Sequence, residues 1–137
     1  MTSVARFIAL PMAMLLASCY PSPQSVPAPN DANTRTVLDF MSAYGRRDLD
    51  GMMKYLDEDA VFRGTGAVLS KLQIREFFLA SFKKHPKLRV EVGSLKTVQG
   101  NIYASVKVET ESIWADTWIF EMKNHKIHSY SLASGSR

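Results

Sequence analysis

The hydrophobic pattern of this chain changes its period at Pro86, and this change constrains the fold more than any other feature. Before Pro86, apolar residues recur every three or four positions, which predicts amphipathic helices over about 34–45, 48–56 and 70–85. After Pro86, apolar and polar residues alternate, which predicts strands over about 88–92, 102–108, 114–122 and 127–132. Helices followed by an antiparallel meander predict an α+β fold, in which a sheet with one inward face curls around the helices.

Local signals indicate where these helices begin. Thr34 or Asn33 is expected to cap the first helix, and Asp48 is expected to cap the second. Ser70 and Gln73 have the spacing of a capping box, in which each side chain bonds the backbone amide of the other residue. A brief strand at 60–62 is predicted between the second and third helices.

Composition divides the chain into four segments. Residues 1–18 contain a short basic start and an apolar run, and residues 19–33 contain four prolines among small polar residues. A proline-rich segment of this kind forms a semi-extended tether rather than a folded unit. Residues 34–132 suffice for one hydrophobic core, and residues 133–137 form a tail. The formal net charge of +4 is too small to indicate a nucleic-acid partner.

The N-terminal segment resembles a bacterial lipoprotein signal peptide. Its apolar run, 7–17, is too short to span a membrane, and 16–19 (Leu-Ala-Ser-Cys) is similar to a lipobox. The resemblance implies cleavage before Cys19 and a lipid on Cys19, which is the only cysteine in the chain. The lipid would hold the protein at a membrane of the cell envelope, and Tyr20 favours the outer membrane where the organism has one. The alternative is an ordinary secretory signal that ends at a chance cysteine.

Three motifs of the domain follow one another in a distinctive order: Asp48 to Gly51, Leu56 to Phe62 and Ile74 to Phe78. In sequence and order they are similar to the nuclear transport factor 2-like superfamily, which includes SnoaL-like polyketide cyclases, ketosteroid isomerase and limonene epoxide hydrolase. The resemblance implies a cone-shaped α+β barrel, with three N-terminal helices packed in a curved antiparallel sheet. It leaves the function open, because the fold serves enzymes, binding modules and assembly domains alike.

The same resemblance allows a test for isomerase chemistry. In the isomerases, a tyrosine on the first helix donates to the developing enolate, and the matching residue here is Phe40. The catalytic aspartate matches Gly64, and the third group, a protonated carboxylic acid on a late strand, matches the region of Asp116. Steroid isomerase chemistry is therefore not expected, and no Asp-Arg-Asp arrangement indicates an epoxide hydrolase.

Asp116 is the strongest candidate for a chemical role. By alternation it shares a face with Trp114, Trp118 and Phe120, where a carboxyl group is costly unless it is paired or protonated. On this interpretation Asp116 is an acid, a base or a ligand anchor. The alternative is a turn near Ala115, which breaks the alternation and places Asp116 in solvent.

His128 and Tyr130 share a face of the last predicted strand. With Asp116 they could form a polar cluster for acid–base chemistry. The alternative is an exposed histidine beside a tyrosine of the core. Three scattered histidines and no metal-binding motif predict neither a metal site nor a cofactor.

Seven residues with aromatic side chains are predicted to line an apolar pocket in the cone, or alternatively to form a packed core: Phe40, Tyr44, Tyr55, Phe62, Trp114, Trp118 and Phe120.

The expected function is noncatalytic binding of a small apolar ligand or an envelope protein, with Asp116-dependent isomerase, cyclase or hydrolase chemistry as the alternative. A homodimer through the sheet, with Ile113 and Ile119 outward, is a further expectation. The basic residues at 83–89 are expected to face anionic headgroups or to form a solvated helix end.

Overall fold

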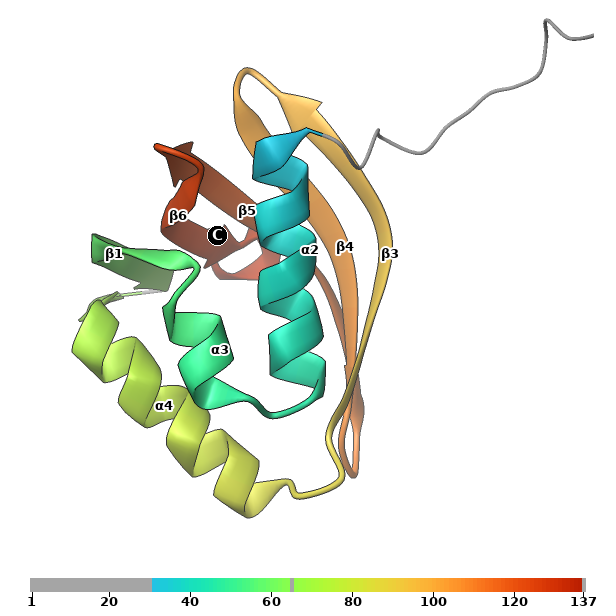
Figure 1. Cartoon of the computed structure of the whole chain (residues 1–137). Helices are drawn as coiled ribbons and strands as arrows, with labels where there is room; N and C mark the ends of the chain where they lie inside the picture. The colour runs from blue at the N-terminus through green and yellow to red at the C-terminus, as the bar shows by residue number, and fades with distance from the viewer. Residues whose placement is uncertain (1–30, 65, 137) are drawn as a thin grey trace, which may run out of the picture.

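The computed structural model describes residues 31–64 and 66–136, and its helices lie against the concave face of one curved sheet (Figure 1). The helices are α2 (Ala32–Gly45), α3 (Leu49–Met53) and α4 (Lys71–Lys84), and the 3-10 turn η2 (Ala133–Ser136) follows the last strand. The strands are β1 (Leu56–Gly64), β2 (Ala67–Ser70), β3 (Arg89–Val98), β4 (Asn101–Glu109), β5 (Ile113–Lys123) and β6 (Lys126–Leu132). The predicted α+β architecture is confirmed.

The predicted signal peptide, Cys19 and the tether as far as residue 30 lie outside the described residues. Within the described part of the chain, no helix is long and apolar enough to cross a membrane.

The six strands form one sheet in the order β2-β1-β6-β5-β4-β3. The strands from β3 to β6 pair antiparallel, as the alternating pattern predicts. However, β1 pairs in parallel with β6, so the sheet is mixed rather than entirely antiparallel. The register of this pair shifts between Leu56 and Val61, which produces a bulge in β1.

The helix starts agree with the sequence at two positions and differ at one. Asp48 caps α3, and Ser70 and Gln73 form the predicted capping box at the start of α4. The predicted cap of the first helix is wrong, because Asp31 caps α2 and accepts hydrogen bonds from the amide and hydroxyl of Thr34 at 3.2 and 2.6 Å. The helix therefore begins at Ala32, inside the segment predicted to be a tether.

The region between α3 and α4 also differs from the prediction. Leu56, predicted to be helical, begins β1 and is fully buried, so β1 is much longer than the predicted strand at 60–62. The segment after Gly64 forms β2, which pairs antiparallel with β1. This pairing extends the sheet beyond β1 and directs the chain into α4.

One part of the core lies where α2 meets the middle of the sheet. Phe40 is fully buried, and its ring lies 6.1 Å from the rings of both Phe120 and Tyr130. The turn between β5 and β6 contacts the start of α2, because the Thr36 hydroxyl donates to the carbonyl oxygen of His125 at 2.9 Å. The start of α2 is therefore fixed to the sheet, whereas its other end faces α4.

Candidate functional site

A cavity of about 770 Å³ lies between α4 and the concave face of the sheet. Its walls come from α2, α4 and every strand except β3, together with the segments that follow α4, β4 and β6. Most lining residues are apolar or aromatic, and the polar ones are few: Tyr44, Ser81, Lys84, His85, Thr110, Asp116, Tyr130 and Ser134. A largely apolar cavity with a few polar groups is typical of a small-molecule site.

Aromatic rings form a continuous wall of this cavity. Trp118 stacks on Tyr130 with a centroid separation of 5.6 Å and an interplanar angle of 6°. Tyr44 lies 5.7 Å from Trp118 and 5.0 Å from Phe78, and Phe62 lies 4.9 Å from Tyr130. Each of these rings contacts at least one other ring, and the wall is suited to stacking against a flat apolar ligand.

Two phenol groups in this wall are kept protonated. Burial raises the pKa of Tyr44 to about 12. Burial also raises the pKa of Tyr130, and the charge that Tyr44 would carry raises it further. Among the residues that the structure describes, neither hydroxyl has a hydrogen-bond partner, yet neither oxygen is sealed from accessible space. Both hydroxyls are therefore free to donate a hydrogen bond to a molecule in the cavity.

Asp116 lies at the wall of the same cavity. It pairs with buried Val106 across the ladder of β4 and β5, so the alternation continues through Asp116 and the alternative of a turn at this point is wrong. Its carboxylate accepts hydrogen bonds from the Thr117 amide at 2.8 Å, the Ser134 amide at 3.2 Å and the Ser134 hydroxyl. These bonds offset the cost of placing the carboxylate on an apolar face and fix η2 against β5.

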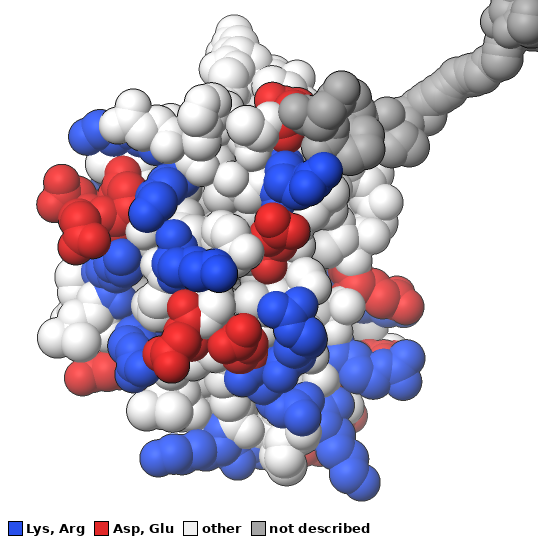
Figure 2. Space-filling view, viewed as in Figure 1, with Lys and Arg blue, Asp and Glu red and all other residues white. Residues whose placement is uncertain are grey.

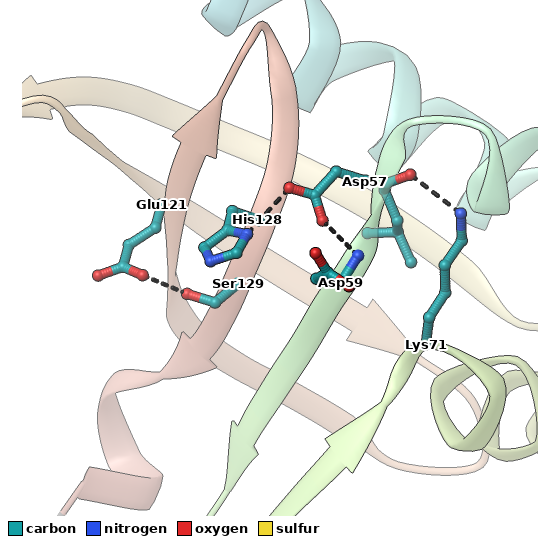
Figure 3. A network of polar contacts seen from close by, with 7 residues as sticks. Asp57, Asp59, Lys71, Glu121, His128 and Ser129 are labelled. Atoms are coloured by element: carbon teal, nitrogen blue, oxygen red, sulfur yellow. Dashed lines mark hydrogen bonds and ion pairs between the residues drawn. The ribbon is translucent and has the colours of Figure 1, made fainter.

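The predicted cluster of Asp116, His128 and Tyr130 does not form. Asp116 contacts Ser134, six residues beyond His128, while His128 Nδ1 lies 2.9 Å from Asp57 Oδ2 at the β1 bulge (Figure 3). Tyr130 lines the cavity, but His128 does not. The alternation is broken in β6, because its register with β5 shifts between Glu121 and Met122 and leaves His128 without a pair. The irregular β1 segment places Asp57 beside His128.

The contacts around His128 form a separate network outside the cavity. The other Asp57 oxygen accepts from the Asp59 amide at 2.9 Å, and Lys71 donates to the Leu56 carbonyl oxygen at 3.1 Å (Figure 3). Next to His128 on β6, the Ser129 hydroxyl donates to Glu121 of the neighbouring strand β5 at 2.6 Å. These polar groups bond to one another, which indicates a structural role in holding the bulge.

The predicted pocket residues fall into two groups. Four of them, Tyr44, Phe62, Trp114 and Trp118, line the cavity. Phe40 and Phe120 are fully buried in the closed core, and half-buried Tyr55 lies away from the cavity. No group of three or more metal-ligating side chains lies within residues 31–64 or 66–136.

The two positions that match the tyrosine and the aspartate of the isomerases do not place such groups in this cavity. Phe40 lies one helical turn before Tyr44 and does not reach the cavity. At Gly64, a Cβ atom would lie 2.8 Å from the Phe62 ring, so an aspartate there would have to displace a wall residue.

Sequence reasoning also missed part of the lining on α4, which includes Phe77, Ser81 and Lys84. Their helical spacing was the available signal, because residues three, four and seven apart share a face.

Three solved structures share this architecture at low sequence identity. An uncharacterized cystatin-fold protein from Novosphingobium aromaticivorans has a TM-score of 0.67 at 17% identity, covering 73% of this chain and 96% of that chain. An NTF2-like protein of unknown function from Cytophaga hutchinsonii has a TM-score of 0.60 at 14% identity, with coverage of 81% and 92%. SalBIII, an epoxide hydrolase/cyclase-like enzyme with a role in pyran ring formation in the polyether salinomycin, has a TM-score of 0.65 at 16% identity, with coverage of 73% and 88%.

At these identities the structural matches show a common fold and nothing more. No curated protein matches the sequence. The SnoaL-like domain profile, however, matches residues 37–130, which is more than half of the chain. The match spans α2 through most of β6 and includes most of the cavity wall. The fold is NTF2-like, and the chain belongs to the SnoaL-like domain family.

Proposed function

We propose that this SnoaL-like domain binds a small, flat, apolar molecule that carries a carbonyl group. The observation that carries the proposal is the pair of protonated phenols, Tyr44 and Tyr130, which lack hydrogen-bond partners in an aromatic wall. A carbonyl oxygen accepts two hydrogen bonds and has no donor of its own, so it complements two phenols. The rings of Trp118 and Phe62 supply apolar contact for the rest of the molecule.

Binding without chemistry is the function that we favour. The carboxylate of Asp116 is the one acidic group in the cavity lining, and three hydrogen bonds to Thr117 and Ser134 already occupy it. A general base must reach the proton that it removes, and this carboxylate is directed toward η2. The domain therefore supplies hydrogen-bond donors and apolar walls for a ligand, while the Asp116 carboxylate is held by η2.

A matched pair of ligands tests this proposal. Fluorenone and fluorene have nearly the same shape, but only fluorenone has a carbonyl group. The hydrophobic core lies entirely between Val37 and Leu132, so a chain of residues 30–137 retains it and can be used. Tyr44→Phe and Tyr130→Phe each remove one hydroxyl and leave the ring in place.

We expect isothermal titration calorimetry to show tighter binding of fluorenone than of fluorene. Each tyrosine variant should weaken fluorenone binding by roughly 3- to 10-fold and leave fluorene binding unchanged, since one hydrogen bond contributes about 1 kcal/mol. The double variant should bind the two ligands equally. Equal fluorenone affinity in the wild-type and double-variant proteins would contradict the proposal.

Proton abstraction beside a carbonyl is the second candidate function. It is favoured by one observation, which is that Asp116 lines the same cavity as the two phenols. The phenols would polarise the carbonyl group and Asp116 would accept the adjacent proton. Deuterium exchange into 2-tetralone, followed by NMR, tests this candidate. Exchange faster in wild-type protein than in Asp116→Asn supports catalysis, and equal rates exclude Asp116 as the base.

We also propose that the domain works at the cell envelope, attached through lipid on Cys19. The support is the lipobox-like sequence at 16–19 and the prolines between Cys19 and α2.

A homodimer formed through the sheet stays a prediction. Ile113 is 62% exposed at the cavity, while Ile119 is partly buried.

A further inference from the structure

The mouth of the cavity combines features that ligand binding alone does not require. Large apolar residues are usually buried, yet three of the residues that line this cavity are largely exposed: Trp114 (69%), Ile113 (62%) and Phe77 (57%). Single exposed apolar residues are common, but several around one opening indicate an interaction surface. We call these three residues the apolar rim.

One lysine lines the cavity together with the apolar rim, and two more lie close to it in sequence. Lys84 lines the cavity seven residues after Phe77, on the same face of α4, and Lys83 and Lys87 flank it in sequence. Figure 2 shows Lys and Arg side chains gathered at the lower edge of the molecule, over the end of α4 and the start of β3. We call Lys83, Lys84 and Lys87 the basic rim.

The charges of the basic rim are not neutralised by nearby acids. Within the described part of the chain, none of the three lysines forms an ion pair. Three acidic residues close to the mouth lie beside other groups, and the pair of Glu111 with His85 is ionic only when the histidine is protonated. Glu111 lies 2.9 Å from His85, Glu109 lies 3.6 Å from Arg89, and Asp116 bonds to η2. The mouth therefore presents unpaired positive charge beside exposed apolar groups.

We propose that the mouth docks on an anionic lipid bilayer, with the apolar rim inserted at the headgroup level and the basic rim against lipid phosphates. Tryptophan prefers the membrane interface, and lysines near an anionic surface each add to the attraction. A protein partner would not require this combination of tryptophan with unpaired lysines around an opening. Docking in this orientation places the cavity directly over the bilayer, which is where apolar molecules concentrate.

The test is co-sedimentation of residues 30–137 with vesicles of pure phosphatidylcholine or with 30% phosphatidylglycerol. This chain lacks the signal peptide and Cys19, so neither contributes to binding. We expect binding to anionic vesicles only, weakening as salt is added. Replacing Lys83, Lys84 and Lys87 by Gln should lower the partition coefficient roughly 100-fold, because each lysine contributes about a factor of five.

Matched control variants distinguish binding through this surface from effects of net charge and of exposed apolar residues elsewhere. Gln at Lys96, Lys123 and Lys126 removes the same charge from the opposite end of the strands and should have little effect. Trp114→Ala should lower binding about tenfold, whereas Leu72→Ala, at a residue 66% exposed but outside the cavity lining, should not.

Tryptophan fluorescence provides a second readout of the same binding. Of the two tryptophans in the chain, Trp118 is buried and Trp114 is exposed, so insertion should shift the emission to shorter wavelength. No binding to anionic vesicles, or equal losses in the two lysine triple variants, would overturn the proposal. So would light scattering that shows the rim pairing two copies of the chain in place of vesicle binding. The double variant of Tyr44 and Tyr130 should dock normally, so a failed ligand site and a failed membrane surface remain distinguishable.

Discussion

The two buried phenols make the stability of the domain depend on pH in the alkaline range. Burial raises the pKa of Tyr44 from 10.0 to about 12, so the unfolded chain loses this proton first as the pH rises. The contribution of Tyr44 is therefore fully present below pH 10, is lost between about 10 and 12, and then levels off. Since one pKa unit corresponds to about 1.4 kcal/mol, Tyr44 alone should lower the free energy of unfolding by about 2–3 kcal/mol over this range. The raised pKa of Tyr130 adds to the loss.

Tyr44→Phe isolates this effect. Its hydroxyl has no partner among the described residues, so the variant should differ from wild type by less than about 1 kcal/mol at pH 8. At pH 12 the variant should be more stable than wild type, because it has no proton to lose at this position. Urea unfolding followed by far-ultraviolet circular dichroism at pH 8 and pH 12 gives both values.

Tyr103→Phe is the matched control, because Tyr103 is half-exposed on β4, outside the cavity lining. Lysine deprotonation above pH 10 affects all the proteins equally and cancels in the comparison. If Tyr44→Phe lost as much stability between the two pH values as Tyr103→Phe, the phenol of Tyr44 would not be desolvated. The proposed hydrogen-bond donation from this residue would then lose its physical basis.

Four further changes test other parts of the structure. Asp31→Ala should lower the free energy of unfolding by about 1 kcal/mol in urea melts, since it removes the cap of α2, whereas an unchanged midpoint would place the helix start elsewhere. Phe40→Tyr should destabilise by about 1–3 kcal/mol without improving fluorenone binding, because its hydroxyl would enter the closed core. Ser81→Leu should fill part of the cavity and weaken fluorenone and fluorene alike in calorimetry, while the fold stays intact. Cys19→Ser should abolish acylation and processing, and mass spectrometry showing a mature chain that begins elsewhere would contradict the predicted anchor.

Local sequence signals were sufficient to predict most of the fold. The change of period at Pro86, the cap at Asp48 and the capping box at Ser70 all correspond to observed structure. The parallel pairing of β1 with β6 could not be predicted in this way, because a strand's own pattern does not specify its partner. The extra length of β1 was missed for a related reason: Leu56 is buried in the sheet, but its spacing from the preceding apolar residues also suits a helix.

The site was only partly predictable, because inward-facing aromatic residues look the same in a packed core and in a cavity wall. Phe40 and Tyr44 lie on the same face of α2, about 6 Å apart along the helix axis, yet one is in the core and the other lines the cavity. Asp116 was placed correctly on the inward face by alternation, but its partner Ser134 lies in the predicted tail, where no periodic pattern exists. The contact that holds the Asp116 carboxylate against η2 therefore had no local signal.

The position of the cavity follows from which side chains the helices direct at the sheet. Phe40, on α2, meets Phe120 and Tyr130 in the core, and of these three residues only Tyr130 also lines the cavity. On the side of α4, the small side chains of Ala80 and Ser81 line the cavity together with the larger Phe77 and Phe78. Larger side chains at Ala80 and Ser81 should reduce the volume of the cavity, which is the reasoning behind the Ser81→Leu prediction. Burial keeps the two phenols protonated, the cavity beside them leaves room for an acceptor, and the exposed residues of the apolar rim line the same cavity.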